Sequence, residues 1–82
     1  MPMKQDKKIY QSELISRLRR ALKYPIGVNH FAVLMHGWIK KHPDTAPNVH
    51  TLFVRKRTDG ELWLRAEEVD DLSRYAGYDL RK

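Results

Sequence analysis

Apolar residues recur at helical spacing in two segments of the N-terminal half of the chain. Between Ile9 and Tyr24 they follow an i, i+4, i+7, i+8 pattern, and Pro25 then disfavours further helix. A second stripe lies between Asn29 and Lys41 and comprises Phe31, Leu34, Met35, Trp38 and Ile39. The pattern predicts two amphipathic helices joined by a short turn containing Gly27, with Asn29 as the N-cap of the second.

The spacing changes after a loop at residues 42–48 that contains two prolines. From Val49 to Ala66, two runs rich in Val, Thr, Leu, Phe and Trp flank Thr58-Asp59-Gly60, and Asp-Gly between apolar runs is a strong hairpin signal. A two-residue loop would divide the apolar residues between both faces of the hairpin. A three-residue loop with a left-handed Gly60 gathers them on one face, so we predict that register. This apolar face comprises Leu52, Val54, Leu62, Leu64 and Ala66.

A third helix is predicted from Ala66 to Ala76, because apolar residues share one side of it and Gly77 follows. The expected fold is a small single-domain α+β protein of element order α-α-β-β-α, with a two-stranded antiparallel hairpin packed on helices. This order resembles that of winged-helix proteins, with the hairpin as the wing. Those proteins normally place three helices before the wing, so no residue roles are transferred. We expect residues 1–8 to form a mobile basic tail and residues 9–82 the compact domain.

The chain has 82 residues, no cysteine and a formal net charge of +6. A chain of this size forms one domain with a modest core, which no disulfide or thiolate zinc site can supplement. We therefore expect stability to come from packing, with a homodimer as a further contribution. No apolar run approaches the roughly 20 residues that a membrane-spanning helix needs. No signal-peptide core follows the N-terminus either, so we expect a cytoplasmic protein without a membrane partner.

No pattern of residues indicates an enzyme. The histidines are not spaced at i, i+4, which a helical metal site requires. The acidic run at residues 67–71 lies where a helix N-terminus attracts carboxylates for electrostatic reasons alone. There is neither a nucleophile elbow nor a glycine-rich phosphate loop. We expect no catalytic residue, no metal and no cofactor.

The charge is distributed unevenly along the chain. Residues 1–57 carry 12 basic and 3 acidic side chains, whereas residues 58–82 carry 4 basic and 7 acidic ones. This asymmetry indicates a basic surface that faces a polyanion or an acidic protein. On the second face of the predicted hairpin, guanidinium groups alternate with aromatic rings: Phe53, Arg55, Arg57, Trp63 and Arg65. Alternatively, the third helix or the N-terminal segment covers the two rings, with the arginine stems packed over them.

Two hypotheses of function follow. The first is a small non-enzymatic regulator that binds nucleic acid, because arginine pairs with phosphate and aromatic rings stack on bases. We expect DNA rather than RNA as the partner. Arg17, Arg20 and Lys40 would assist from the two N-terminal helices, in a helix-turn-helix-like arrangement. The second is a protein-interaction module, of the type that phages and other mobile elements use, which binds and inhibits or redirects a larger host complex. Its partner would be an acidic or nucleic-acid-binding protein.

Overall fold

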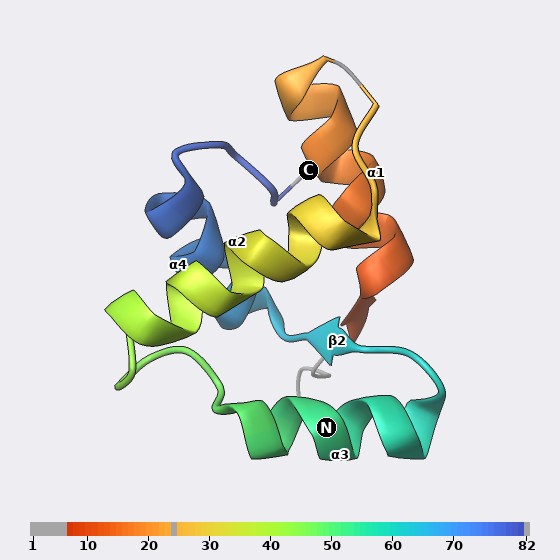
Figure 1. The fold of residues 1–82 in the computed structure, drawn as a ribbon, viewed down its shortest axis with the longest axis vertical. Helices are drawn as coiled ribbons and strands as arrows, with labels where there is room; N and C mark the ends of the chain where they lie inside the picture. Colours follow the sequence, from red (N-terminus) through yellow and green to blue (C-terminus); the bar gives the residue numbers. More distant parts are fainter. Residues whose placement is uncertain (1–6, 24, 82) are drawn as a thin grey trace, which may run out of the picture.

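The computed structural model describes residues 7–23 and 25–81, and in these residues it has four α-helices and two short strands (Figure 1). In chain order they are β1 (Ile9–Tyr10), α1 (Gln11–Leu22), α2 (Val28–Lys41), α3 (Val49–Asp59), β2 (Trp63–Leu64) and α4 (Ala66–Ala76). The α+β class and the two-stranded antiparallel sheet are confirmed. Of the tail predicted at residues 1–8, residues 1–6 lie outside the described residues.

The hairpin predicted at residues 49–66 is wrong, because its first run forms helix α3. Asn48 begins this helix by accepting a hydrogen bond from the Thr51 backbone N at 2.8 Å. Gly60 ends it with a φ of 83°. Gly60 therefore has the predicted left-handed conformation, but at a helix end rather than in a hairpin loop.

The short sheet joins the N-terminal segment to the C-terminal half of the chain. Ile9 pairs with Leu64 and Tyr10 with Trp63, so β2 finds its partner before α1 instead of in the run at residues 52–54. The predicted order α-α-β-β-α is corrected accordingly, since one strand precedes all the helices and the other follows α3. A pairing between distant segments cannot be read from local spacing.

The other three predicted helices are confirmed, with shifts at two ends. α1 begins at Gln11 because the two residues before it pair in the sheet. α2 begins at Val28 with Gly27 as its N-cap, so the prediction of Asn29 in that role is wrong. α4 ends before Gly77, whose φ is 81°.

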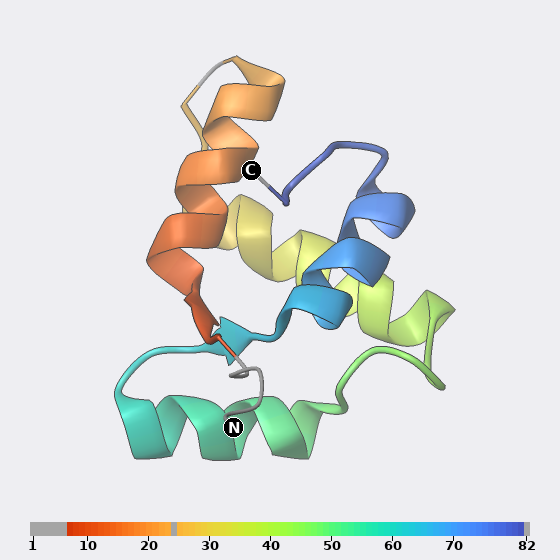
Figure 2. The same ribbon diagram turned by 180° about the vertical axis from the view of Figure 1, so that it is seen from behind.

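The core lies between α1, α2, α4 and β2. Its fully buried side chains are Leu14, Leu18, Phe31, Trp38, Leu64, Val69, Leu72 and Leu80. Figures 1 and 2 show α3 at one end of the molecule, next to the sheet and opposite the C-terminal end of α1. In α3 only Arg55 is buried, so this helix contributes little to the core and lies at its periphery.

The loop that leads to α3 is fixed by Asp71 of α4. This carboxylate accepts hydrogen bonds from Trp38 Nε1 and Thr45 Oγ1, both at 2.8 Å, and lies 3.1 Å from His42 Nδ1. Burial raises the pKa of Asp71, but the hydrogen bonds from these three side chains outweigh it and lower the pKa to about 2. The first half of the loop is thereby bound to α2 and α4.

Candidate interaction groove

The residues predicted to share one face of a hairpin are divided between two places. Trp63 is 8% exposed, and its ring centroid lies 4.2 Å from Arg55 Cζ, 4.9 Å from Lys8 Nζ and 5.3 Å from Arg65 Cζ. Phe53 is 57% exposed on α3, with Arg57 Cζ 5.7 Å from its ring centroid. The predicted common face is therefore wrong. For Trp63 the alternative is confirmed, since arginines and the N-terminal segment cover its ring.

Arg55 connects α3 to β2 and α4. Its guanidinium donates to both carboxylate oxygens of Glu68, at 2.8 and 3.0 Å, and to the Trp63 carbonyl oxygen at 3.0 Å. Arg55 is only 8% exposed, so a buried bidentate ion pair holds α3 in place. In this position its charge is already paired within the fold.

The C-terminal end of α3 is held by the N-terminal segment. Asp59 accepts hydrogen bonds from Lys8 Nζ at 2.9 Å and from the Tyr10 hydroxyl at 3.0 Å. These bonds hold the pKa of the Asp59 carboxyl below its usual value. Together with Arg55, they fix the orientation of α3 relative to the rest of the domain.

The three further basic residues predicted to bind lie on other elements. Arg17 donates to Glu13 at 2.9 Å and to the Leu80 carbonyl oxygen at 3.0 Å, so it holds the C-terminal segment against α1. Arg20 is exposed in the C-terminal half of α1, which Figures 1 and 2 place far from α3. Lys40 is exposed near the end of α2. The structure therefore does not gather the predicted basic residues into one surface.

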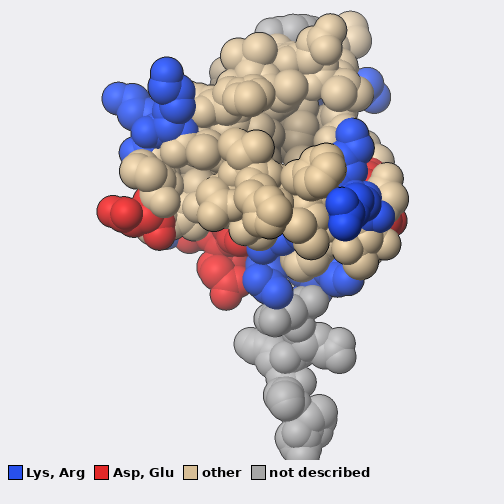
Figure 3. All heavy atoms as spheres, turned by 60° about the horizontal axis from the view of Figure 1, so that its bottom comes forward, with Lys and Arg blue, Asp and Glu red and all other residues tan. Residues whose placement is uncertain are grey.

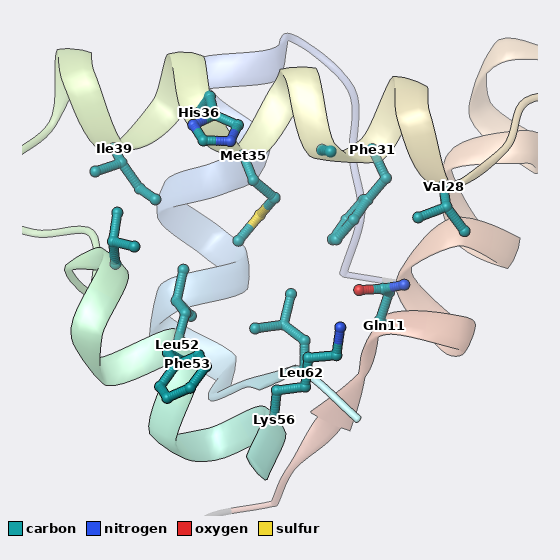
Figure 4. Close-up of a pocket in the computed structure, with 12 residues that line it drawn as sticks. Gln11, Val28, Phe31, Met35, His36, Ile39, Leu52, Phe53, Lys56 and Leu62 are labelled. Atoms are coloured by element: carbon teal, nitrogen blue, oxygen red, sulfur yellow. The ribbon is translucent and has the colours of Figure 1, made fainter. Parts of the chain in front are cut away.

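A groove of about 360 Å³ lies between α2 and α3, and we call it the α2–α3 groove. Figure 4 shows Phe31 and Met35 pointing into it from α2, with Leu52 and Leu62 pointing toward them from the other side. On α2 the lining residues recur at helical spacing: Val28, Ala32, Met35 and Ile39. On α3 they do so as well: Val49, Leu52, Phe53 and Lys56. Two helical stripes thus face each other across an open channel.

Several side chains of the α2–α3 groove are far more exposed than core residues. The exposed fraction is 57% for Val28, 60% for Val49 and 57% for Phe53. The lining residues include Lys56 and no acidic side chain. Glu61, which precedes the lining residue Leu62, instead accepts a hydrogen bond from the Ser12 backbone N at 2.7 Å, at the start of α1.

Figure 3 shows this end of the molecule: basic side chains lie on several sides of a surface without charged groups, and acidic side chains lie at its left and lower edge. Lys56 lines the α2–α3 groove and Arg57 lies beside Phe53, whereas Lys40 is exposed near the end of α2, outside the lining. In the part of the chain that the structure describes, none of these three takes part in an ion pair. Their positive charges are therefore available to an external partner.

The sequence did not predict this groove, although α2 carried a signal for it. Apolar residues occupy more of the circumference of α2 than the core covers, since Val28 and Val33 remain exposed.

Among residues 7–23 and 25–81, no three His, Cys, Asp or Glu side chains are grouped to hold a metal ion. No helix in these ranges combines the length and apolar character needed to cross a membrane.

Comparisons of this chain with protein-family models, curated proteins and solved structures found no match. Two features of the domain point to a binding function: the apolar α2–α3 groove, and the basic side chains at its edge that form no ion pair.

Proposed function

We propose that this protein is a non-enzymatic interaction module that binds a segment of another protein in the α2–α3 groove. The observation that supports it is the open apolar channel, with Phe53 57% exposed at its edge. Exposed apolar side chains gathered at one place are a feature of binding sites for proteins, membranes or ligands. Exposed aromatic side chains are frequent anchors in such interfaces, because they bury a large area with little loss of side-chain entropy.

The way α3 is held supports this proposal. The Arg55–Glu68 ion pair and the Asp59 contacts fix the helix, so Phe53 and Val49 are presented on a rigid support. A partner then need not pay for ordering the helix on binding. Burying the 57% of Phe53 that is exposed would contribute about 1–2 kcal/mol from apolar area alone.

Nucleic-acid binding is the second candidate, and it is supported by the exposed, unpaired Lys56 and Arg57 on α3. These side chains could contact phosphate groups, in which case binding would weaken steeply with salt. It has less support than the first candidate, because Arg55 and Trp63 are engaged inside the fold. Of the two aromatic rings on the predicted hairpin face, Phe53 is the exposed one and would stack on a base, whereas Trp63 is buried.

The proposal can be tested by affinity purification from cells that produce the protein, after nuclease treatment. The baits are the wild type, Phe53→Asp and the control Val33→Asp, which changes a 72% exposed residue of α2 outside the groove lining. We expect one stoichiometric protein with the wild type and the control, and its loss with Phe53→Asp. Recovery that disappears on nuclease treatment would favour the second candidate. Equal recovery with all three baits would contradict the use of the groove.

A further inference from the structure

We propose that the segment bound in the α2–α3 groove is an acidic amphipathic α-helix of about three turns. This inference rests on the proposed function and specifies the partner. Its apolar residues would lie at i, i+4 and i+7, facing the groove, with carboxylates on the flanks of that stripe.

The shape of the groove favours a helix. The stripe on α2 runs from Val28 to Ile39, which at 1.5 Å per residue is about 16 Å, the length of three helical turns. Packed helices interlock ridges of side chains with grooves, and two facing stripes offer such a seat to a third helix. A strand fits poorly, because side chains line the channel and would leave the strand's backbone groups without partners. A helix satisfies its backbone internally.

The charge at the edges favours an acidic segment. Lys56 is within the lining, and Arg57 lies beside the lining residue Phe53. No acidic residue lines the groove, so a basic segment would meet only like charge there. Carboxylates on the flanks of the bound helix would meet these cations at the rim, where such pairs increase specificity and association rate.

A second copy of the chain is a poorer occupant. In a two-fold dimer formed through this groove, Lys56 and Arg57 of each copy would approach those of the other. Three of the four α4 carboxylates are also already engaged within the fold: Glu68 with Arg55, Asp70 with Arg74 and Arg81, and Asp71 with its hydrogen-bond donors. The charge pattern therefore indicates a different protein as the partner.

The test is selection from a displayed library of random 16-residue peptides on the immobilised full-length protein, with counter-selection on Phe53→Asp. We expect the enriched peptides to be net acidic, with apolar residues at i, i+4 and i+7. Synthetic copies of them would then be titrated by fluorescence anisotropy, with circular dichroism to confirm that every protein variant is folded.

Two variants should weaken the binding of an enriched peptide. Phe53→Ala should raise Kd about 30-fold, as expected for a central aromatic anchor. Reversal of charge in Lys56→Glu with Arg57→Glu should raise it at least about tenfold and reduce its salt dependence. The matched controls are Val33→Ala and Lys41→Glu, exposed residues of α2 outside the groove lining, and they should leave Kd unchanged.

Each other outcome contradicts a defined part of the reasoning. Peptides that require Phe53 but are neutral or basic, or lack helical spacing, would overturn the acidic helix and leave the proposed function standing. No enrichment that depends on Phe53 would overturn both. Binding of a DNA duplex that depends on Arg57, without peptide binding, would also overturn both. A dimer in sedimentation that Phe53→Asp dissociates would show that a second copy occupies the groove.

Discussion

Replacing Arg55 with alanine is the sharpest test of how α3 is attached. The change removes two hydrogen bonds to Glu68, one to the Trp63 carbonyl oxygen, and a cation 4.2 Å from the Trp63 ring centroid. It also leaves the Glu68 carboxylate, whose side chain is 15% exposed, without its guanidinium partner. α3 would then retain the half-buried Leu52 and the Asp59 contacts as its attachment.

The expected loss is large relative to the stability of such a domain. Removing one partner of a buried ion pair typically costs about 3–5 kcal/mol, because the other charge remains buried. At about 0.05–0.15 kcal/mol per residue, a chain of this length has a free energy of unfolding of about 4–12 kcal/mol. Arg55→Ala should therefore remove about 3–4 kcal/mol, a substantial fraction of the total. Arg55→Lys should lose less, because it keeps the charge and gives up the bidentate geometry.

The measurement is urea unfolding followed by tryptophan fluorescence and far-ultraviolet circular dichroism. Glu68→Gln and the double variant complete a cycle, and the coupling energy between the two residues should exceed about 1 kcal/mol. Arg57→Ala, an exposed arginine two residues further along α3, is the control and should change stability by less than about 0.5 kcal/mol. A loss below about 1 kcal/mol for Arg55→Ala, or equal losses for both arginines, would refute the attachment described above.

Three further substitutions test other contacts. Asp71→Asn should lower the urea midpoint at pH 7. The pKa of Asp71 in the folded protein is about 2, below the ordinary 3.8, so the ionised carboxylate stabilises the wild type by an amount on the order of 2 kcal/mol at neutral pH. The wild type should lose this stabilisation as the pH falls from about 4 toward 2. Gly37→Ala should lower the thermal midpoint, despite the higher helix propensity of alanine, because the new Cβ would overlap the Tyr75 hydroxyl; Tyr75→Phe should recover part of the loss. Gly60→Ala should cost about 1 kcal/mol in urea unfolding, because its φ is 83°.

Each of these predictions has a clear contrary result. A difference between wild type and Asp71→Asn that stays constant from pH 7 to pH 2 would show that the carboxylate is not stabilised as described. A higher thermal midpoint for Gly37→Ala would place Tyr75 elsewhere. An unchanged urea midpoint for Gly60→Ala would mean that α3 ends differently.

Local spacing was sufficient to predict α1, α2 and α4. In each of these helices the apolar residues recur with a single period, that of an α-helix. The helices end near Pro25, near the loop at residues 42–48 and near Gly77, and these helix-ending signals act on residues only a few positions away. The same spacing was ambiguous in the run that forms α3. Val, Thr and Phe favour a strand there, whereas Val49, Leu52 and Phe53 also fit i, i+3, i+4, and Asn48 was available as an N-cap.

Tertiary contacts decided α3 and the site built on it. Glu68 lies 13 residues after Arg55 in the sequence, and its ion pair with Arg55 gives α3 its buried contact. β1 pairs with β2 in the place where the sequence pattern had predicted a strand at residues 52–54. The sequence pattern named Phe53, Arg55, Arg57, Trp63 and Arg65 as candidate binding residues on one face, and two of these arginines instead cluster around Trp63. It could not separate the exposed members from the buried ones, because that depends on which distant side chain reaches each of them. The α2–α3 groove likewise depends on how the loop fixed by Asp71 spaces two helices, and hydrophobic periodicity carries no information about that distance.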